Sequence, residues 1–497
     1  MNVVLICPKI PDTFWGYKYA LPFVGKRAAL PPLPLVTIAA MLPKSWNLRL
    51  VDTNITELQD SDIAWADYAM ITGMAIQKRS ALQLIDRCHA AEVPVVCGGP
   101  LFTMEPEAYP QVDHLVLDEG EITLPMFLSD LEAGKPQRIY RAGEQRADLT
   151  QSPVPMWHLL DLGAYAMVGI QYSRGCPFDC DFCAVTTMLG HKHRVKTPQQ
   201  IIAELNALRD AGWAGPVFFV DDNLIGSPRR LKAELLPALI KWQTDRGPIE
   251  FITQLSINLA DNPELTAMMV EAGFITVFVG IETPAEASLV ECKKTQNRRR
   301  DLVADIKKLH RAGLEVQAGF IVGFDSDLPD IFQRQIDFIQ ASAIPTAMVG
   351  MLQAPLGTRL FARMEREQRL VGHSTGDNVD GTTNIIPAMG LENLMAGYHR
   401  LLREIYAPDA YYNRVRELLR ELRPTPLKLP VRKEHLMAMA ASALRIGIIA
   451  RERWEYWKLL GWTIWNRPRS FGTAVALSIS GYHLRRFCEE ATGPMAV

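Results

Sequence analysis

Three closely spaced cysteines constrain this chain more than any other feature of its sequence. Cys176, Cys180 and Cys183 follow the spacing C-x3-C-x2-C, and they come soon after an apolar, strand-like run at residues 167–172. Three thiolates on one short loop can bind three irons of a cubane cluster, which leaves the fourth iron open to another ligand. The spacing therefore predicts a 4Fe-4S site at these three cysteines.

Two other interpretations of the cysteines are weaker. A structural zinc site normally closes with four nitrogen or sulfur ligands, and His191 and His193 follow closely enough to supply the fourth. A disulfide framework is disfavoured because the other five of the eight cysteines are scattered and no secretory signal opens the sequence. Cys7, Cys97 and Cys292 lie in or near apolar runs, where a free cysteine acts as a small core residue.

The composition is that of an ordinary globular protein. The chain has 497 residues, of which 48% are hydrophobic and 22% charged, enough for two or three domains. The net charge of −2 gives no indication of nucleic-acid binding. No uninterrupted apolar run reaches about 18 residues, so the sequence predicts no membrane-spanning helix and favours the cytoplasm.

Residues 1–140 alternate short apolar strands with helix patterns. We expect strands at 3–7, 48–51, 68–72, 93–97 and 114–117, and helices at 35–41, 78–91 and 123–131. This alternation is typical of an open parallel sheet with helices on both faces, a doubly wound, Rossmann-like domain. Ligands of such sheets bind outside the carboxyl ends of the strands. Gly98-Gly99-Pro100 follows one of these strands and would let a bulky group approach the backbone closely.

A second alternation runs from residue 166 to residue 365, after a linker at 141–165. Six strands are expected at 167–172, 217–220, 251–255, 276–280, 316–321 and 347–352. Helices are expected between them at 198–210, 230–244, 262–272, 299–312 and 330–340. Successive units of this kind predict a partial TIM barrel, in which the active site lies at the carboxyl ends of the strands. The cysteine loop follows the first strand and therefore falls at that end.

Taken together, these motifs resemble the radical S-adenosylmethionine (SAM) proteins that contain a B12-binding domain. The cysteine spacing is the signature of radical SAM enzymes, and Cys97–Pro100 and Leu117–Glu121 resemble patterns of the B12-binding domain. Pro11–Trp15, followed by Gly25–Leu33, resembles the subgroup that includes hopanoid C-2 methylase and bacteriochlorophyll side-chain methylases. The resemblance covers nearly the whole chain. It implies an α/β architecture with an N-terminal cobalamin-binding Rossmann-like domain, a partial (βα)6 radical SAM barrel and a helical C-terminal extension.

The positions of polar and glycine residues at the strand ends, together with this resemblance, predict which residues bind the two organic cofactors. The residues expected to bind SAM are Phe182, Asp221, Asp222, Gln254, Ser256, Glu282 and Gly323. Acidic groups suit the SAM ammonium because charge-assisted hydrogen bonds are strong. The residues expected to bind cobalamin are Thr13, Asp52, Thr72, Gly73, Gly98, Gly99, Pro100, Glu119, Gly120 and Glu121. Residues 8–13 lack the histidine of the Asp-x-His-x-x-Gly pattern, so cobalamin would be held without a lower histidine ligand.

Residues 366–497 lose the alternation and are expected to be mostly helical. Trp454, Trp457, Trp462 and Trp465 stand close together there, interleaved with arginine and lysine. Tryptophan and arginine together suit peripheral contact with a membrane, where aromatic rings lie at headgroup level. The same residues also suit a helical cap packed on the barrel, and both interpretations stay open.

The resemblance implies an enzyme that transfers a methyl group to an unactivated carbon. One SAM would be cleaved at the cluster to a 5′-deoxyadenosyl radical, and another would supply the methyl group through cobalamin. The apolar C-terminal region favours a hydrophobic small molecule such as a hopanoid, another polyprenoid or a tetrapyrrole. The cluster would need a flavodoxin- or ferredoxin-like electron donor. Two alternatives stay open: a radical SAM cyclase or rearrangement enzyme without methyl transfer, and a non-catalytic cobalamin- or metal-binding protein.

Overall fold

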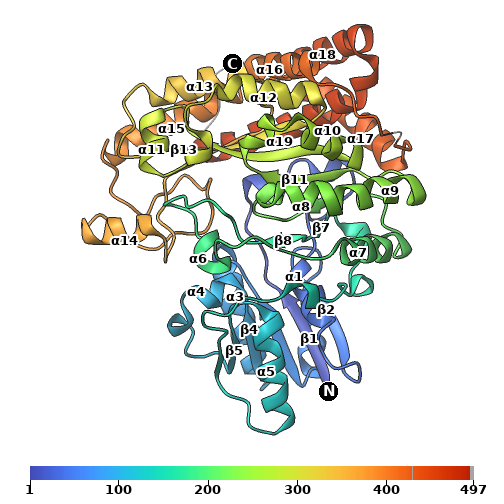
Figure 1. Cartoon of the computed structure of the whole chain (residues 1–497), viewed down its shortest axis with the longest axis vertical. Coiled ribbons are helices and arrows are strands. Elements are labelled where there is room, and N and C mark those ends of the chain that lie inside the picture. The colour runs from blue at the N-terminus through green and yellow to red at the C-terminus, as the bar shows by residue number, and fades with distance from the viewer. Residues whose placement is uncertain (428, 493–497) are drawn as a thin grey trace.

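The computed structural model describes residues 1–427 and 429–492 and shows two parallel sheets with a helical C-terminal segment (Figure 1). The N-terminal sheet lies at the lower end of Figure 1, and the second sheet and the C-terminal helices form the upper part. This arrangement confirms the predicted α/β architecture. Within the described ranges, no helix combines the length and the apolarity needed to cross a membrane.

The N-terminal sheet has six parallel strands in the order β2-β1-β3-β4-β5-β6. Successive side chains of β1 pack into two different hydrophobic cores, with Val4 and Ile6 on one face of the sheet and Val3 and Leu5 on the other. Helices therefore cover both faces, as the sequence predicted. The strands are β1 (Asn2–Cys7), β2 (Asn47–Asp52), β3 (Tyr68–Thr72), β4 (Val95–Gly98), β5 (His114–Val116) and β6 (Ile139–Tyr140), and the helices are α1 (Leu33–Ala39), α2 (Asp60–Trp65), α3 (Lys78–Ala90), α4 (Pro100–Met104) and α5 (Gly120–Glu132).

The second sheet also has six parallel strands, and its order β7-β10-β11-β12-β13-β14 follows the sequence. One or more helices cross over between successive strands, which gives the partial barrel that the sequence predicted. The strands are β7 (Val168–Ile170), β10 (Val217–Phe219), β11 (Phe251–Leu255), β12 (Phe274–Glu282), β13 (Glu315–Val322) and β14 (Ala347–Met351), and the main helices between them are α7 (Pro198–Asp210), α9 (Leu236–Arg246), α10 (Pro263–Ala272), α12 (Leu302–Ala312) and α13 (Ile331–Ser342).

Several local features differ from the sequence-based expectations. The short strand β6 was not expected, nor was the antiparallel hairpin of β8 (Ser173–Arg174) and β9 (Arg194–Val195). The helix expected at 230–244 is divided into α8 (Pro228–Arg230), a π-helical turn (Leu231–Leu235) and α9. These elements are short or irregular, and their hydrophobic periodicity is too brief to identify them from sequence.

The C-terminal segment is helical, as expected, and packs on the barrel helices. Helices α15 and α16 contact α13 and α12, and α19 is buried between α15, α16 and α18. The helices are α14 (Arg359–Arg366), α15 (Leu391–Ile405), α16 (Pro408–Glu421), α17 (Lys433–Leu444), α18 (Arg453–Asn466) and α19 (Phe471–Thr492).

The first loop of the N-terminal domain is embedded in the rest of the molecule. Trp15 donates its ring N–H to the sulfur of Met348 on β14 at 3.1 Å, and its ring lies 5.4 Å from that of Phe278 on β12. The carbonyl of Phe14 lies 2.9 Å from the imidazole Nε2 of His483 on α19. This loop therefore joins the N-terminal sheet, the barrel and the last helix.

Gly98, at the end of β4, offers a test of the packing of the N-terminal sheet. A Cβ at this position would lie 2.7 Å from the backbone carbonyl oxygen of Val116 on β5, and the backbone cannot give way without disturbing the sheet. We expect Gly98→Ala to lower stability by about 1–3 kcal/mol, measured as the thermal unfolding midpoint. Gly472→Ala is the matched control, because a Cβ there meets nothing within 4 Å. An unchanged midpoint for Gly98→Ala would contradict this packing.

Candidate active site

The carboxyl ends of the two sheets face each other across the domain boundary. His373, in the segment after α14, lies 3.1 Å from the Glu105 carboxylate, next to α4. The hydroxyl of Thr187 on α6 (Val185–Leu189) donates to the carbonyl of Gly357, and a Cβ on that glycine would lie 3.3 Å from Met104. Figure 1 shows α6 between the barrel and the helices α3 and α4. The two ligand-binding edges predicted from sequence thus meet at one place.

The cysteine loop is held at the base of the hairpin formed by β8 and β9. The N–H of Cys176 donates to the carbonyl of Gly190 at 3.3 Å. Gly175 has a φ of +91°, and a Cβ on it would lie 2.5 Å from the Lys192 carbonyl oxygen, so only glycine fits there. The carboxylate of Asp221, after β10, accepts hydrogen bonds from the N–H of Tyr172 and from the N–H and hydroxyl of Ser173. These contacts fix where the loop leaves the sheet.

The chemistry of the three thiols fits an iron–sulfur cluster. Cys176, Cys180 and Cys183 are free, and they are buried or half-buried on one loop. Burial raises the pKa of each thiol, and the positive charge of Lys294 acts in the opposite direction on all three. Within residues 1–427 and 429–492, no three His, Cys, Asp or Glu side chains are already arranged as a metal site. The assignment of these cysteines as cluster ligands rests on donor type and spacing, and it stays a prediction.

A loop at residues 292–297 packs against the cysteine loop, and sequence reasoning did not identify it as part of the site. The amide of Gln296 donates to the sulfur of Cys180 at 3.9 Å, and the carbonyl of Cys292 accepts from the N–H of Asp181 at 3.1 Å. The Lys294 ammonium lies 2.6 Å from the Glu282 carboxylate. The only signal in the sequence was a polar loop after the fourth barrel strand.

Comparison with known proteins identifies the family of this chain. Residues 170–339 match the model of the radical SAM superfamily, and residues 358–495 match a domain of unknown function. The chain is 38% identical to an uncharacterized methyltransferase of Synechocystis, over 98% of this chain and 92% of that protein. It is 34% identical to the hopanoid C-2 methylase of Rhodopseudomonas palustris, over 83% of this chain and 78% of that protein.

The chain belongs to the B12-binding-domain-containing radical SAM proteins. Its subgroup includes hopanoid C-2 methylase and the bacteriochlorophyllide methyltransferases, as the sequence motifs indicated. Among solved structures, the fold is similar to that of the cobalamin-dependent SAM radical enzyme OxsB, with a TM-score of 0.63 at 13% identity over 100% of this chain and 84% of that chain. The chain is therefore a radical SAM enzyme of a family whose named relatives include methyltransferases.

The residues expected to bind SAM lie at the carboxyl end of the barrel, but only some of them have polar groups that are free to bind a ligand. Asp222 and Gln254 are half-buried, and neither side chain bonds to another described residue. Burial raises the pKa of Asp222 to about 6. Asp221 and Glu282 are already paired, with the hairpin and with Lys294 respectively. Asp222 and Gln254 are thus the freest polar groups of the expected set.

The other three expected SAM residues occupy different local settings. The hydroxyl of Ser256 donates to Asn258 at 2.5 Å, which turns it toward its own loop. Gly323 has a φ of +101°, and a Cβ on it would lie 3.1 Å from Leu394. Phe182, between the last two cysteines, is half-buried with its ring 6.3 Å from that of Phe324. Of these three residues, Phe182 is the one that lies on the cysteine loop itself, where its ring packs against a small hydrophobic cluster.

The glycine-rich loops expected to bind cobalamin converge at the carboxyl edge of the N-terminal sheet. A Cβ on Gly99, whose φ is +90°, would lie 2.5 Å from the hydroxyl of Thr72, and the carbonyl of Gly73 accepts from the N–H of Leu101. Thr72, Gly98 and Gly99 are half-buried, and Pro100 is exposed. This edge is a topological switch point, because β1 is followed in space by β2 on one side and β3 on the other. The edge therefore fits a bound cofactor.

Other residues expected to bind cobalamin are engaged within the protein. The buried Asp52 carboxylate accepts from the hydroxyl of Tyr165 at 2.8 Å, and Thr13 is buried at the start of a turn. A Cβ on Gly120 would lie 2.7 Å from Ile38. The carboxylates of Glu119 and Glu121 form ion pairs with the barrel. Cobalamin contact at these positions stays a prediction, and the carboxylates of Asp52, Glu119 and Glu121 already have partners within the protein.

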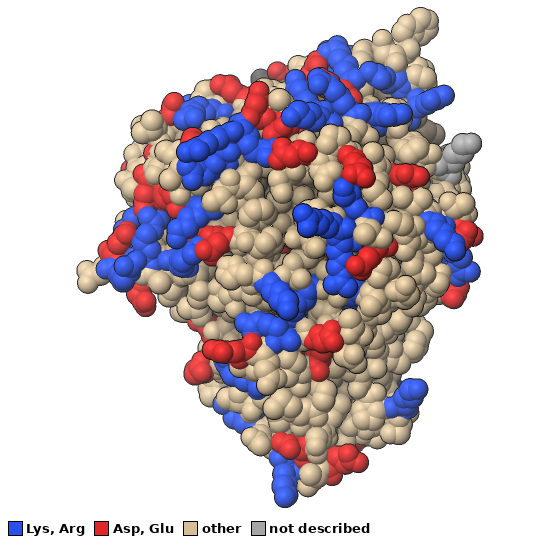
Figure 2. All heavy atoms as spheres, in the orientation of Figure 1, with Lys and Arg blue, Asp and Glu red and all other residues tan. Residues whose placement is uncertain are grey.

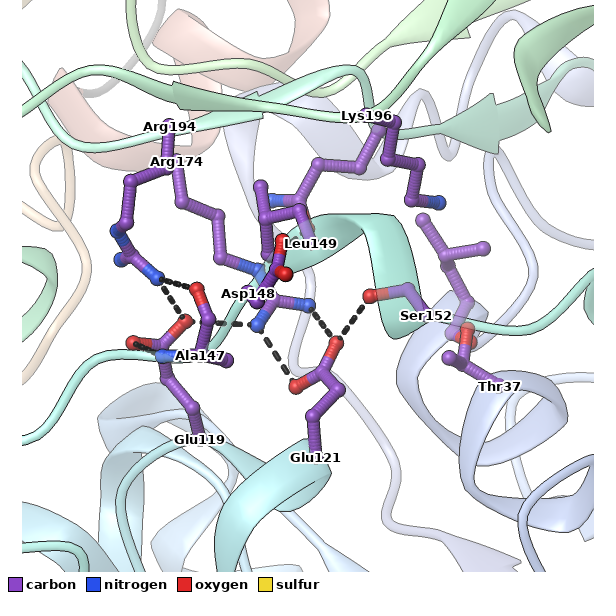
Figure 3. Close-up of polar contacts among 12 residues, drawn as sticks. Thr37, Glu119, Glu121, Ala147, Asp148, Leu149, Ser152, Arg174, Arg194 and Lys196 are labelled. Carbon is purple, nitrogen blue, oxygen red and sulfur yellow. Dashed lines mark hydrogen bonds and ion pairs between the residues drawn. The ribbon is translucent and has the colours of Figure 1, made fainter. Parts of the chain in front are cut away.

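Glu119 and Glu121 hold the base of the cysteine loop through a buried network of ion pairs (Figure 3). Arg174 binds Glu121 in a bidentate fashion at 2.8 and 2.9 Å and Glu119 at 2.9 Å. Arg194 binds Glu119 at 2.8 Å. The hydroxyl of Ser152 donates to Glu121 at 2.6 Å. The network joins α5 of the N-terminal domain to both strands of the hairpin.

The pKa of Glu121 gives this network a measurable signature. Burial alone would raise the pKa, but Arg174 and Ser152 outweigh it and lower the pKa to about 2. Since the unfolded pKa is about 4.3, the ionised carboxylate stabilises the fold above that pH, and this contribution is lost as the pH falls toward about 2.

We expect Glu121→Gln to lower stability by roughly 3 kcal/mol at pH 7 and to flatten the loss of stability between about pH 4.5 and pH 2. The measurement is the unfolding midpoint across that pH range, compared with the wild type. Glu57→Gln, at an exposed position, is the control. Parallel pH curves for Glu121→Gln and the wild type would show that the Glu121 carboxylate has no special environment.

Proposed function

We propose that this protein is a cobalamin-dependent radical SAM C-methyltransferase that acts on an unactivated carbon of a hydrophobic small molecule. The observation that carries the proposal is the meeting of two sheet edges: the hairpin that carries the cysteine loop is ion-paired to the start of α5 of the Rossmann-like domain, and His373 after the barrel contacts Glu105 beside α4. The family relationship with hopanoid C-2 methylase, over most of both chains, supports methyl transfer as the reaction.

The residues of this chain would bind and orient the reactants. When bound, the cluster and SAM supply a 5′-deoxyadenosyl radical, and cobalamin supplies the methyl group. Cys176, Cys180 and Cys183 would hold the cluster, and the Asp222 carboxylate could accept hydrogen bonds from the SAM ammonium. Phe182 lies between two of the cysteines and offers an aromatic face to adenine. A methyl group that passes to a carbon radical needs no side-chain base, so we assign none.

A cluster of aromatic and thioether side chains on one face of the barrel sheet supports a hydrophobic methyl acceptor. Val277 and Val279 of β12 are buried in the main hydrophobic core, so Phe278 points to the opposite face of the strand. There it meets Trp15 and Met348, which are both half-buried. An aromatic and thioether lining favours a hopanoid, another polyprenoid or a tetrapyrrole over a charged substrate.

A second candidate function is radical cyclisation or rearrangement without methyl transfer. The chain is 25% identical, over 64% of its length, to the anaerobic magnesium-protoporphyrin IX monomethyl ester cyclase of Synechocystis. The two reactions differ in product mass, because each methylation adds one CH2 unit.

Two partners belong to this proposal. Reduction of the cluster by one electron requires a donor, and we propose a flavodoxin- or ferredoxin-like protein. We also propose peripheral membrane contact through the C-terminal helices, which concerns a surface distinct from the cysteine loop.

Replacement of the three cysteines by alanine tests the proposed cofactors. In protein purified without oxygen and supplied with cobalamin, we expect about four irons per wild-type chain and none in Cys176→Ala/Cys180→Ala/Cys183→Ala. The variant should retain the corrinoid spectrum and lose 5′-deoxyadenosine formation. Cys488→Ala, a buried cysteine on α19, should leave the iron content unchanged.

Each contrary result points to a different enzyme. Iron without corrinoid would overturn methyl transfer and leave a simpler radical SAM reaction. Zinc in place of iron would overturn the radical mechanism. A product of unchanged skeleton mass, formed with SAM cleavage, would favour the cyclase or rearrangement.

A further inference from the structure

The C-terminal helices expose a group of large apolar side chains. Trp465 is 89% exposed, Ile449 is 70% exposed and Trp454 is 67% exposed. They lie on α18 and on the π-helical turn Arg445–Ile449 that precedes it. Single exposed apolar residues are ordinary, but a contiguous exposed apolar surface marks a binding site.

Helix α18 is apolar on two opposite faces. Tyr456, Leu459 and Leu460 are buried against the core. Trp454, Trp457, Ile464 and Trp465 recur at the spacing of a single helical face and are exposed. A helix that only packs on a globular core needs one apolar stripe. Packing on the core therefore does not account for the second stripe, which stays exposed apart from the contact of Trp457 with Gly447.

The exposed stripe of α18 continues onto the neighbouring helix. The ring N–H of Trp457 donates to the carbonyl of Gly447 at 2.9 Å, which joins α18 to the π-helical turn. That turn follows α17 directly, and Leu436 and Leu444 of α17 are more than half exposed. We call the exposed apolar side chains of α17, the π-helical turn and α18 the C-terminal apolar surface.

Cations border this apolar surface. Residues 431–470 contain eight Lys or Arg against three Glu, a net charge of +5, whereas the whole chain has a net charge of −2. Exposed Arg445, Arg451, Arg453 and Arg469 form no ion pair within the described residues. Two of the three acids are neutralised, since Glu455 pairs with Lys458 and Glu452 with Arg485. In Figure 2, Lys and Arg gather over the upper end of the molecule, where Figure 1 places α16 and α18.

We propose that the C-terminal apolar surface docks on a membrane that contains anionic phospholipids. Tryptophan rings suit the headgroup level, and the aliphatic parts of arginine can lie among apolar groups while the guanidinium reaches a phosphate. A second copy of this chain fits less well, because a symmetric dimer would bring two surfaces of net positive charge together. The proposal does not depend on the identity of the methyl acceptor.

The test uses the full-length protein and vesicles of two compositions, phosphatidylcholine alone and phosphatidylcholine mixed with phosphatidylglycerol. We expect cosedimentation with the mixed vesicles, a blue shift of tryptophan fluorescence and weaker binding at high salt. Arg451→Gln/Arg453→Gln should reduce partitioning on the order of thirtyfold. Ile464→Ser/Trp465→Ser should reduce the binding that remains at high salt.

Two matched controls separate this surface from general effects of charge and polarity. Lys44→Gln/Lys135→Gln removes the same charge from exposed positions of the N-terminal domain, and Val290→Ser/Leu328→Ser removes exposed apolar groups near the barrel. Both controls should bind vesicles like the wild type. Equal partitioning of Arg451→Gln/Arg453→Gln and the wild type, or no binding to either vesicle, would overturn the proposal. A concentration-dependent dimer that Ile464→Ser/Trp465→Ser abolishes would assign the surface to a second copy.

Discussion

A buried set of ion pairs fixes the two sheets of this chain relative to each other. Glu119 and Glu121 leave the Rossmann-like sheet at the start of α5, and their partners Arg174 and Arg194 lie on the hairpin that carries the cysteine loop. Burying four charges is costly, and the cost is offset only because each carboxylate accepts several well-placed hydrogen bonds. The cysteine loop therefore cannot shift against the N-terminal domain without leaving a charge buried and unpaired.

This fixed arrangement of the two domains determines which polar groups remain free to bind a ligand where the two sheets meet. Glu282 and Lys294 satisfy each other, and the positive charge of Lys294 lies near the thiols. Charge and hydrogen bonds close to the sulfur atoms tune the potential of an iron–sulfur cluster. Asp222 and Gln254 remain without a side-chain partner among the described residues. The site thus keeps polar groups free at the edge where a small charged ligand is expected.

Local patterns were predictable from the sequence, and distant pairings were not. The cysteine spacing and the alternation of strands and helices are local, and they identified both sheets and the position of the loop. Arg174 and Glu121 are 53 positions apart, and Tyr165 and Asp52 are 113 positions apart. Hydrophobic periodicity carries no information about such distant pairs. Asp52, Glu119 and Glu121 were therefore predicted to bind cobalamin, whereas in the structure their carboxylates bind other residues of the protein. The hairpin strands are too short for their period to be recognised.

The tryptophans of α18 show how two interpretations of one segment can apply to different residues. Trp462 is half-buried and packs against the core, with Arg420 over its ring, as a helical cap requires. Trp454 and Trp465 lie on the exposed side of the helix, opposite the buried Tyr456, Leu459 and Leu460. The buried face holds α18 against α16 and α19, so the exposed rings are positioned before any partner binds. Because these side chains are already held in place, membrane binding would cost little conformational entropy. Most of the apolar area that a membrane would cover therefore contributes to the binding free energy.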